Sequence, residues 1–545
     1  MKIFDLVFNS DLQTKLFIGV SIVVLFIIQL FLFRLKRIKI VFFIVLHSLF
    51  GFLLAAVTTY NPFAHAIIYI LPSFLLSWFV RKLTHKNKEV NNEMKFTFNF
   101  TSSNKKIEVY RNGIFRHFGV FGGTGAGKTK SILKPTIKQM AYYGMSGVII
   151  DYKYNDLIKS AYTHYLGSSV SFKPINTFDL TRSLQCNPVS SKIIKDPEDA
   201  IEAAKNVIAN LAKESKEGFW VDAGESLLSA VIWKYRTELS DLCYLPYVTA
   251  TISRTDSHTL MNFLANNTQA WDLAMPYFKA IKSDRTLGNI ETTVANALRK
   301  ISVPKVSWIL SGDDIDFFNI NNPEKPSILS LSNNMAKDTT YSPIIALILA
   351  TASQLMSYPN RNPSGIIIDE ASRIRLPELE RILSTLREYD IFVMLCMQNI
   401  YQGEKIYKDD WQSILDNLSG KFFGYTSNQK SIEMYARMYG KLYKAFSSRT
   451  KRRTDLLDSS VTVSERQVFI KEPNEFLDFE EGHFFGRLKK ANIQAFDETF
   501  EMYNDSNEYD IPVINSGATE KAIQDNYEKI INTVLNIIEP FRPND

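Results

Sequence analysis

The chain has 545 residues, of which 46% are hydrophobic, and this length excludes a single small domain. Residues 1–93 hold 10 Lys and Arg against 4 Asp and Glu, an excess that equals the net charge of +6 of the whole chain. The charge therefore excludes a uniformly basic nucleic-acid-binding protein, and any contact with nucleic acid depends on local patches.

Residues 1–90 predict a membrane region. Three runs without Asp, Glu, Lys or Arg occupy residues 16–33, 40–59 and 63–80. Each is about as long as a helix that crosses the ~30 Å hydrocarbon core of a bilayer. Asn61-Pro62 separates the second run from the third. Basic clusters at 34–39 and 81–88 predict that these flanks, and the remainder of the chain, lie in the cytoplasm.

Residues 91–186 and 305–504 predict two parts of one α/β domain. Apolar strands are expected at residues 146–153, 327–332, 365–369, 391–398 and 421–426. Helical patterns separate most of these strands, which indicates a mainly parallel sheet. Near the start of the first part, Asn112-Gly113 stands between extended segments and predicts a β-hairpin.

Residues 187–304 predict an all-helical inserted domain. This segment has helical periodicity and little strand character, and it begins where Asp196 is expected to cap a helix whose first residue is Pro197. The expected buried face of that helix holds Ile201, Ala204, Ile208 and Leu211.

Residues 505–545 predict a polar linker followed by an amphipathic helix. The apolar stripe of the helix consists of Ile523, Tyr527, Ile530, Val534 and Ile537. Two interpretations stay open at this point: the helix docks a partner, or it folds back on the α/β domain.

The stretch GGTGAGKT, residues 122–129, fits the nucleotide-binding pattern G-x-x-x-x-G-K-[ST] and stands between an apolar strand and a helix. The predicted nucleotide-binding residues are Gly122, Gly123, Thr124, Gly125, Ala126, Gly127, Lys128 and Thr129. Backbone N–H groups of such a loop enclose the phosphates, Lys128 neutralises their charge, and the Thr129 hydroxyl binds Mg²⁺. The expected ligands are ATP and Mg²⁺, and a chance Gly-rich turn is the alternative.

Two strand ends offer a carboxylate for the Mg²⁺ shell. Asp151 ends SGVIID, and Asp369 ends SGIIID, where Glu370 follows. We favour Asp369 as the metal ligand and Glu370 as the catalytic residue that polarises water, because an ATP hydrolase is expected to have this pairing. Asp151 is a secondary candidate, with an ordinary polar strand end as the alternative.

Three further features each carry a functional and a structural interpretation. Gln398 ends an apolar strand, so it either contacts the γ-phosphate or the attacking water, or is a satisfied strand-end amide. Arg387 is either an arginine finger that acts in trans or a solvated helix residue. The basic run 447–453 either contacts phosphate backbones or is a solvated loop.

In this order, the motifs resemble the type IV coupling proteins, the TraG/TraD-like ATPases of conjugation and type IV secretion. The resemblance covers about residues 95–500, and it rests on the stretches GGTGAGKTKSILKPTIKQ, DYKYNDL, NPVSSKIIKDPEDAIEAAKNVIANL, IIIDEASRI, MQNIYQGEKIY and DFEEGHFFGRLKK. Tyr152 and Tyr154 stand where that family has Pro and Gly, and three predicted spans stand where it has two.

The resemblance implies a RecA-like P-loop ATPase domain with an all-helical insertion, anchored in the bacterial inner membrane and assembled as a hexamer. It implies that the protein recruits relaxase-bound single-stranded DNA, effector proteins or both, and drives them into a type IV secretion channel. Helix 518–538 is then a candidate adaptor site.

Two other hypotheses stay open. One is a cargo receptor in which nucleotide binding controls assembly only. The other is an FtsK-like DNA pump, which is disfavoured because the sequence has no long linker after the membrane region and no recognisable winged-helix segment at its C-terminus.

Overall fold

The computed structural model describes residues 94–543, except 102–103, 154, 212–218, 282–286 and 452–458. The predicted spans at 16–33, 40–59 and 63–80 lie outside the described residues. Among the described helices, Met335–Met356 is long and apolar enough to cross a membrane, with a mean hydropathy of 1.2, but 78% of its apolar window is buried inside the chain. Its buried side chains belong to the main hydrophobic core.

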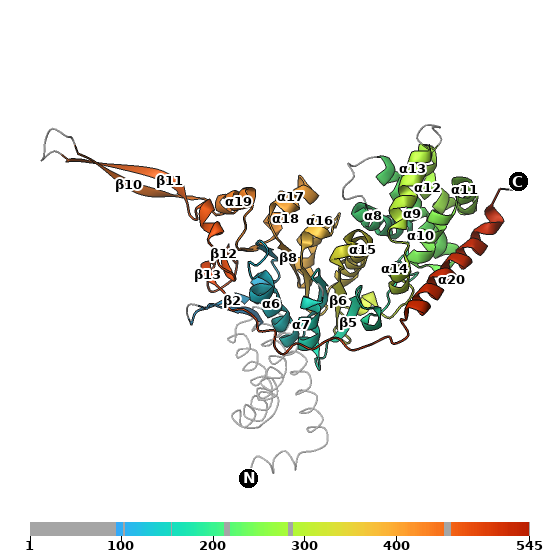
Figure 1. Cartoon of the computed structure of the whole chain (residues 1–545), viewed down its shortest axis with the longest axis horizontal. Coiled ribbons are helices and arrows are strands. Elements are labelled where there is room, and N and C mark those ends of the chain that lie inside the picture. The colour runs from blue at the N-terminus through green and yellow to red at the C-terminus, as the bar shows by residue number, and fades with distance from the viewer. Residues whose placement is uncertain are drawn as a thin grey trace, which may run out of the picture. The chain divides into compact units, whose positions relative to one another are not determined.

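A nine-stranded sheet lies at the centre of the unit formed by residues 95–545 (Figure 1). Its strand order is β13-β12-β9-β3-β8-β7-β4-β6-β5. The bounds are β3 Phe118–Phe121, β4 Ser146–Asp151, β5 Ser171–Asn176, β6 Ser327–Ser332, β7 Ser364–Ile368, β8 Ile391–Met397, β9 Gly420–Phe423, β12 His483–Arg487 and β13 Ala495–Thr499. Strands β3 to β9 pair in parallel, whereas β12 and β13 are antiparallel additions at one edge. The predicted α/β class with a mainly parallel sheet is confirmed.

The five predicted strands correspond to β4, β6, β7, β8 and β9. Four of these are buried along their whole length, which explains why apolar residues predominate in their sequences. Strand β5 was not predicted. This strand contains Lys173 and Pro174 and lies at the edge of the sheet, where the missing N–H of Pro is tolerated.

The predicted hairpin at Asn112-Gly113 is wrong. Residues Arg111–Ile114 form a short helix, α5, and the hairpin lies earlier, between β1 (Lys95–Asn99) and β2 (Lys106–Tyr110). Gly113 serves packing rather than a turn, because a Cβ at this position would lie 2.5 Å from the carbonyl O of Lys489.

Helices follow one another between β5 and β6 (Figure 1). They are α8 Pro197–Leu211, α9 Phe219–Glu238, α10 Leu245–Arg254, α11 Ser257–Ala265, α12 Thr268–Ile281, α13 Leu287–Arg299 and α14 Pro304–Ile309. Asp196 accepts a hydrogen bond from the N–H of Asp199 at 3.0 Å and so caps α8 as expected. Of the expected buried face, Ala204 and Ile208 are buried, whereas Ile201 is 40% exposed. The boundaries of a separate domain at 187–304 stay a prediction.

The C-terminal segment folds back along the chain. The N–H of Tyr503 donates to Lys130 O at 2.8 Å, and the N–H of Ile514 donates to Thr181 O at 2.9 Å. Helix α20, Glu520–Ile538, then packs its apolar stripe on α10, where Ala250 is buried against Ile530, Val534 and Ile538. The helix therefore folds back on its own chain, but it packs on the helices between β5 and β6 and not on the α/β domain that the second interpretation named.

A two-stranded ribbon lies apart from the central sheet. Strand β10, Lys441–Lys451, pairs antiparallel with β11, Ser459–Phe469, and the pair projects away from the other described elements (Figure 1). The basic run 447–453 is therefore not simply a loop, since its first five residues continue β10.

Candidate nucleotide-binding site

The predicted phosphate loop joins β3 to the helix that follows. Strand β3 pairs in parallel with β8 and β9, so the carboxyl ends of all three strands meet at one edge of the sheet. Gly125 and Gly127 both have a φ of +81°, which glycine adopts without strain. A Cβ on Gly127 would lie 2.5 Å from the backbone N of Gly482, so this position requires glycine for space as well.

The helix after the loop begins with a π-helical turn, Thr129–Leu133, and continues as α6, Lys134–Tyr142. Pro135 accounts for this turn, because it has no N–H to donate to the preceding turn of the helix. The N–H of Lys134 bonds to Thr129 O, five residues earlier. Such π-turns often occur at functional sites, and here the turn places Thr129 at the mouth of the loop.

A cavity of about 180 Å³ lies over the phosphate loop. Its lining residues are Gly123, Gly125, Ala126, Gly127, Lys128, Thr129, Lys130, Lys153, Asp156 and Glu481. Lys128 is buried, and its Nζ donates to the carbonyl O of Gly122 and, at 3.1 Å, to that of Gly123. Of the eight predicted loop residues, Gly122 and Thr124 are the two outside the lining. The other six surround one cationic cavity.

Asp369 and Glu370 follow β7, which is separated from β3 by β8 alone. Both side chains are buried. Glu370 has a φ of +48°, a left-handed conformation that costs energy for a non-glycine residue and that concentrates at functional sites. Gln398 follows β8 and donates from Nε2 to Glu370 Oε1 at 3.2 Å. The structure thus brings these three predicted residues together at the edge of the sheet that carries the phosphate loop.

A lysine stands opposite these carboxylates. The Nζ of Lys153 lies 3.9 Å from Glu370 Oε1. Burial lowers the pKa of Lys153, but the charges of Asp369 and Glu370 outweigh burial and raise it. Burial raises the pKa of Asp369 to about 6; the charge of Lys153 opposes this rise, and the charge of Glu370 adds to it. The charge of Lys128 also lowers the pKa of Asp369, so two lysines oppose the effect of burial on this carboxylate.

The residues fit a magnesium ion bound together with a nucleotide. Among the described residues, Asp369 Oδ1 is a buried oxygen without a hydrogen-bond partner. No group of three or more His, Cys, Asp or Glu side chains within the described part of the chain is arranged to hold a metal. This composition suits Mg²⁺, which usually binds to one or two protein oxygens and completes its shell with phosphate and water. Thr129 and Asp369 would supply the protein ligands.

Asp151 is committed to its own loop. Its Oδ1 accepts from the N–H of Lys153 at 2.8 Å, and its Oδ2 accepts from the N–H groups of Leu157 and Ile158 at 2.9 and 3.3 Å. These bonds cap the start of α7, Asp156–Tyr165. Burial, followed by the charge of Asp369, raises the pKa of Asp151 to about 7. Its geometry supports the structural alternative, a polar strand end that shapes the turn beside the site.

Arg387 is not brought to the nucleotide site of its own chain. It begins a 3₁₀ turn, Arg387–Tyr389, which leads into the amino end of β8. The phosphate loop lies at the carboxyl edge, and the seven residues of β8 separate the two edges by ~23 Å. Arg387 is exposed.

Four residues that line the cavity were not predicted as site residues: Lys130, Lys153, Asp156 and Glu481. Lys153 lies in the stretch DYKYNDL, and Glu481 lies in DFEEGHFFGRLKK, both of which contributed to the family resemblance. Neither stretch has a spacing that reveals its proximity to the phosphate loop. In the fold, Gly482 N–H donates to Ala126 O at 3.1 Å and so holds Glu481 against the loop.

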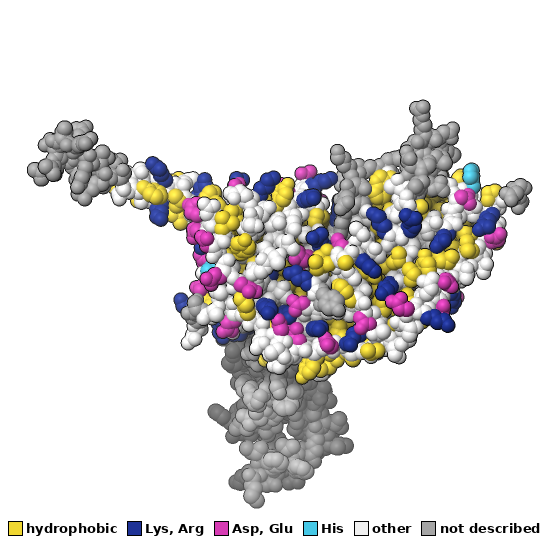
Figure 2. All heavy atoms as spheres, viewed as in Figure 1, with side chains coloured by type: hydrophobic (Ala, Val, Ile, Leu, Met, Phe, Trp, Pro, Cys, Tyr) yellow, Lys and Arg dark blue, Asp and Glu magenta, His cyan; other side chains and the backbone are white. Residues whose placement is uncertain are grey.

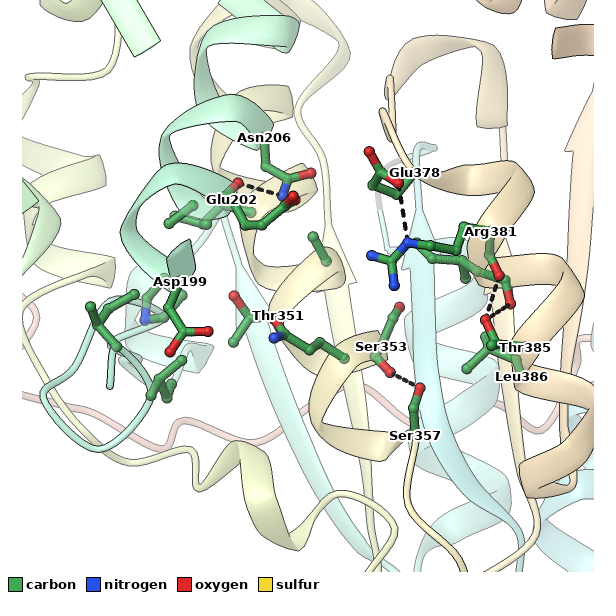
Figure 3. Close-up of a pocket in the computed structure, with 18 of the residues that line it drawn as sticks. Asp199, Glu202, Asn206, Thr351, Ser353, Ser357, Glu378, Arg381, Thr385 and Leu386 are labelled. Atoms are coloured by element: carbon green, nitrogen blue, oxygen red, sulfur yellow. Dashed lines mark hydrogen bonds and ion pairs between the residues drawn. The ribbon is translucent and has the colours of Figure 1, made fainter. Parts of the chain in front are cut away.

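A second cavity, of about 300 Å³, lies between α8, α15 (Asp338–Met356) and α16 (Leu379–Leu386) (Figure 3). Arg381 extends toward Glu378 and donates to it from Nε at 3.1 Å, and the Nζ of Lys205 lies 2.5 Å from the same carboxylate. None of the lining residues belongs to the phosphate loop or to the carboxylate pair. We therefore assign the nucleotide to the smaller cavity.

Comparison with known proteins identifies the fold. The family described as type IV secretory system conjugative DNA transfer matches residues 79–482. The bacterial conjugative coupling protein TrwB, in its unbound form, has a TM-score of 0.58 at 14% identity, with 80% of this chain and 93% of that chain covered. TrwB with a non-hydrolysable GTP analogue has a TM-score of 0.55 at 15% identity, with 75% and 89% covered. TrwB with ADP and Mg²⁺ has a TM-score of 0.55 at 15% identity, with 75% and 88% covered.

No curated protein matches the sequence. The family match nevertheless spans well over half of the chain and includes the phosphate loop, the carboxylate pair and Gln398. The predicted family is confirmed: the chain belongs to the type IV secretory system conjugative DNA transfer family.

Proposed function

We propose that the protein is a membrane-anchored ATPase that drives DNA, protein or both into a type IV secretion channel. Lys128 binds the β- and γ-phosphates, and Thr129 and Asp369 would hold Mg²⁺, which would neutralise charge on the transferred phosphoryl group. Glu370 accepts a proton from the attacking water, and Gln398 orients that water or Glu370 itself.

The observation that carries this proposal is the buried carboxylate pair beside the phosphate loop. A protein that only binds nucleotide needs a phosphate loop and a metal ligand. The second carboxylate, Glu370, adds a general base, and it is held in a left-handed conformation and contacted by Gln398. That arrangement favours hydrolysis over binding alone.

The cargo and assembly complete the proposal. Family membership supports transfer of relaxase-bound single-stranded DNA, with effector proteins as further cargo. The exposed position of Arg387, remote from its own nucleotide site, supports a homo-hexamer in which each Arg387 serves the next subunit. The sequence of residues 1–90 supports an inner-membrane anchor. The outward face of helix 518–538 is left for an adaptor, since its apolar stripe is covered.

ATP turnover by the full-length protein in lipid nanodiscs tests the site. We expect Lys128→Ala and Glu370→Gln to lower the turnover number at least ~100-fold, because each removes a group that acts on the transition state. Glu370→Gln should still bind nucleotide. Glu404→Gln, an exposed carboxylate outside the site, is the matched control and should keep the wild-type rate. Wild-type turnover in both site variants would refute the assignment.

A further inference from the structure

The β10–β11 ribbon takes no part in the nucleotide site. It is a separate two-stranded sheet whose strands each have 11 residues, so it extends ~37 Å at ~3.4 Å per residue. The first seven residues of β10, Lys441 to Ser447, are all exposed. An isolated ribbon of two strands is only marginally stable in water, which indicates that this one has a binding partner.

The ribbon concentrates positive charge in a part of the chain that is otherwise neutral. Residues 94–545 hold 53 Lys and Arg (63 − 10) and 53 Asp and Glu (57 − 4). Within them, residues 441–469 hold 7 Lys and Arg against 3 Asp and Glu, a net charge of +4. The other residues of 94–545 therefore carry a net charge of −4. This segregation indicates an anionic partner for the ribbon.

Two of these cations lie directly opposite each other. Lys444 pairs with Arg466 across the two strands, and both side chains are exposed. Like charges in directly opposed positions destabilise a ribbon. No ion pair among the described residues includes either of them, whereas neighbouring Lys471 contacts Glu475 and Asp497. An anion between Lys444 and Arg466 would relieve their repulsion.

Apolar and aromatic side chains flank this cation pair. Because side chains alternate between the faces of a strand, Leu442 and Phe446 share a face with Lys444, and they are 42% and 41% exposed. Figure 2 shows basic and hydrophobic side chains together on the described part of the ribbon. On the opposite face, Tyr443 is 68% exposed and accepts a hydrogen bond from Gln467 Nε2 at 2.8 Å. Exposed rings next to cations are typical of surfaces that bind single-stranded nucleic acid.

We propose that the ribbon binds the backbone of single-stranded DNA, with phosphates at Lys444 and Arg466 and a base stacked on Phe446. This inference rests on the proposed function, in which DNA is a cargo. Duplex DNA presents the same phosphates, and a two-stranded ribbon fits its major groove, but a duplex keeps its bases stacked and leaves Phe446 without a contact.

Fluorescence anisotropy of a labelled 30-nucleotide oligothymidine tests the proposal with the full-length protein in nanodiscs. The double variant Lys444→Glu/Arg466→Glu should bind at least tenfold more weakly at 100 mM salt. The slope of log affinity against log salt should fall by about 1.4, because two contacts to a single strand contribute about 0.7 each. Lys325→Glu/Lys521→Glu, which reverses two exposed cations elsewhere, is the matched control and should bind within twofold of wild type.

Each of the following results would contradict one part of the proposal. Unchanged affinity in the ribbon variant, with wild-type protein binding the oligonucleotide, overturns the ribbon site and leaves the proposed function intact. Absence of salt-dependent binding in wild type overturns DNA as cargo as well. Tighter binding to a 30-base-pair duplex overturns the single-strand assignment. Loss of the oligomer in the ribbon variant, measured by light scattering, with full DNA affinity, shows that the ribbon joins copies of the chain instead. ATP turnover at the wild-type rate verifies that the variant is folded.

Discussion

Asp369 and Glu370 are adjacent buried carboxylates, and the charges of Lys153 and Lys128 both act on Asp369. Burial favours the neutral form of Asp369, and this raises its pKa to about 6 in the folded chain. A bound Mg²⁺ would instead favour the charged form. In the nucleotide-free protein, burial of the charged Asp369 carboxylate therefore lowers the free energy of unfolding. This loss depends on pH.

Replacing Asp369 by Asn tests this cost. The unfolded chain titrates Asp near pH 3.9, so between about pH 4 and 6 the folded state binds more protons and wild-type stability falls as the pH rises. The Asp369→Asn variant does not titrate there. Its melting temperature in EDTA should therefore rise relative to wild type between about pH 4.5 and 7.5, by the equivalent of about 2 kcal/mol.

The exposed Asp410 supplies the control for this measurement. Asp410→Asn should show no change relative to wild type across the same pH range. A relative melting temperature of Asp369→Asn that stays constant or falls would show that Asp369 is not destabilised by burial.

Whether a site residue can be predicted from the sequence depends on whether local sequence or the tertiary fold positions it. The phosphate loop is local in sequence, so its spacing alone predicts it, and the carboxylate pair follows from the end of an apolar strand. Lys153 and Glu481 reach the loop through a turn and a β-strand connection, and their proximity depends on the whole fold. The role of Asp151 likewise depends on the fold, because its partners are three backbone N–H groups that the sequence does not reveal.

At the scale of elements, the C-terminal segment is tied to the helix that follows the phosphate loop. Lys134 of α6 is fully buried, and its Nζ lies 2.6 Å from Asp156, 2.7 Å from Asp505 and 3.2 Å from Glu508. Burial lowers its pKa, but these carboxylates outweigh burial and raise it. One cation thus holds α6, the start of α7 and the segment that leads to α20 together.

Removing this cation should release the segment. We expect Lys134→Met to leave the carboxylates of Asp505 and Glu508 without their buried partner, which costs about 3 kcal/mol or more. Hydrogen exchange of residues 500–519 should become faster in this variant. Lys138→Met, in the same helix but exposed, is the matched control and should exchange like wild type. Unchanged exchange in Lys134→Met would mean that other contacts hold the segment.

Helices and strands could be predicted from the sequence where their burial determines which residues they contain. Strands β4, β6, β7 and β8 are covered on both faces, so apolar residues predominate in their sequences. Strand β5 at the sheet edge tolerates Pro174, and the β10–β11 ribbon is exposed on both faces, so neither has the apolar pattern of a strand. These segments form strands because they pair with a neighbouring strand, and their own sequences do not indicate it.

At the scale of the whole molecule, the position of Arg387 requires a second copy of the chain if this residue acts on ATP. We expect Arg387→Ala to lower turnover about 10³-fold, as removal of an arginine finger does. Arg381→Ala, which removes a largely exposed arginine from the preceding helix, is the control and should have little effect.

Mixed assemblies separate action in trans from a structural role. A Lys128→Ala subunit keeps its Arg387, and an Arg387→Ala subunit keeps its phosphate loop. Mixing the two inactive variants should therefore restore part of the turnover, because intact loops then face intact arginines. No recovery in assemblies shown to contain both variants would contradict action in trans.

In the proposed function, hydrolysis drives transfer, rather than nucleotide binding alone. The most direct test is conjugative transfer from cells that carry Glu370→Gln in place of the wild-type chain, with the level, membrane location and assembly of the protein measured in the same cells. We expect transfer to fall at least ~100-fold while assembly is unchanged, because this variant should bind ATP without cleaving it. Transfer at the wild-type level would contradict the account and identify the protein as a receptor whose nucleotide controls assembly only.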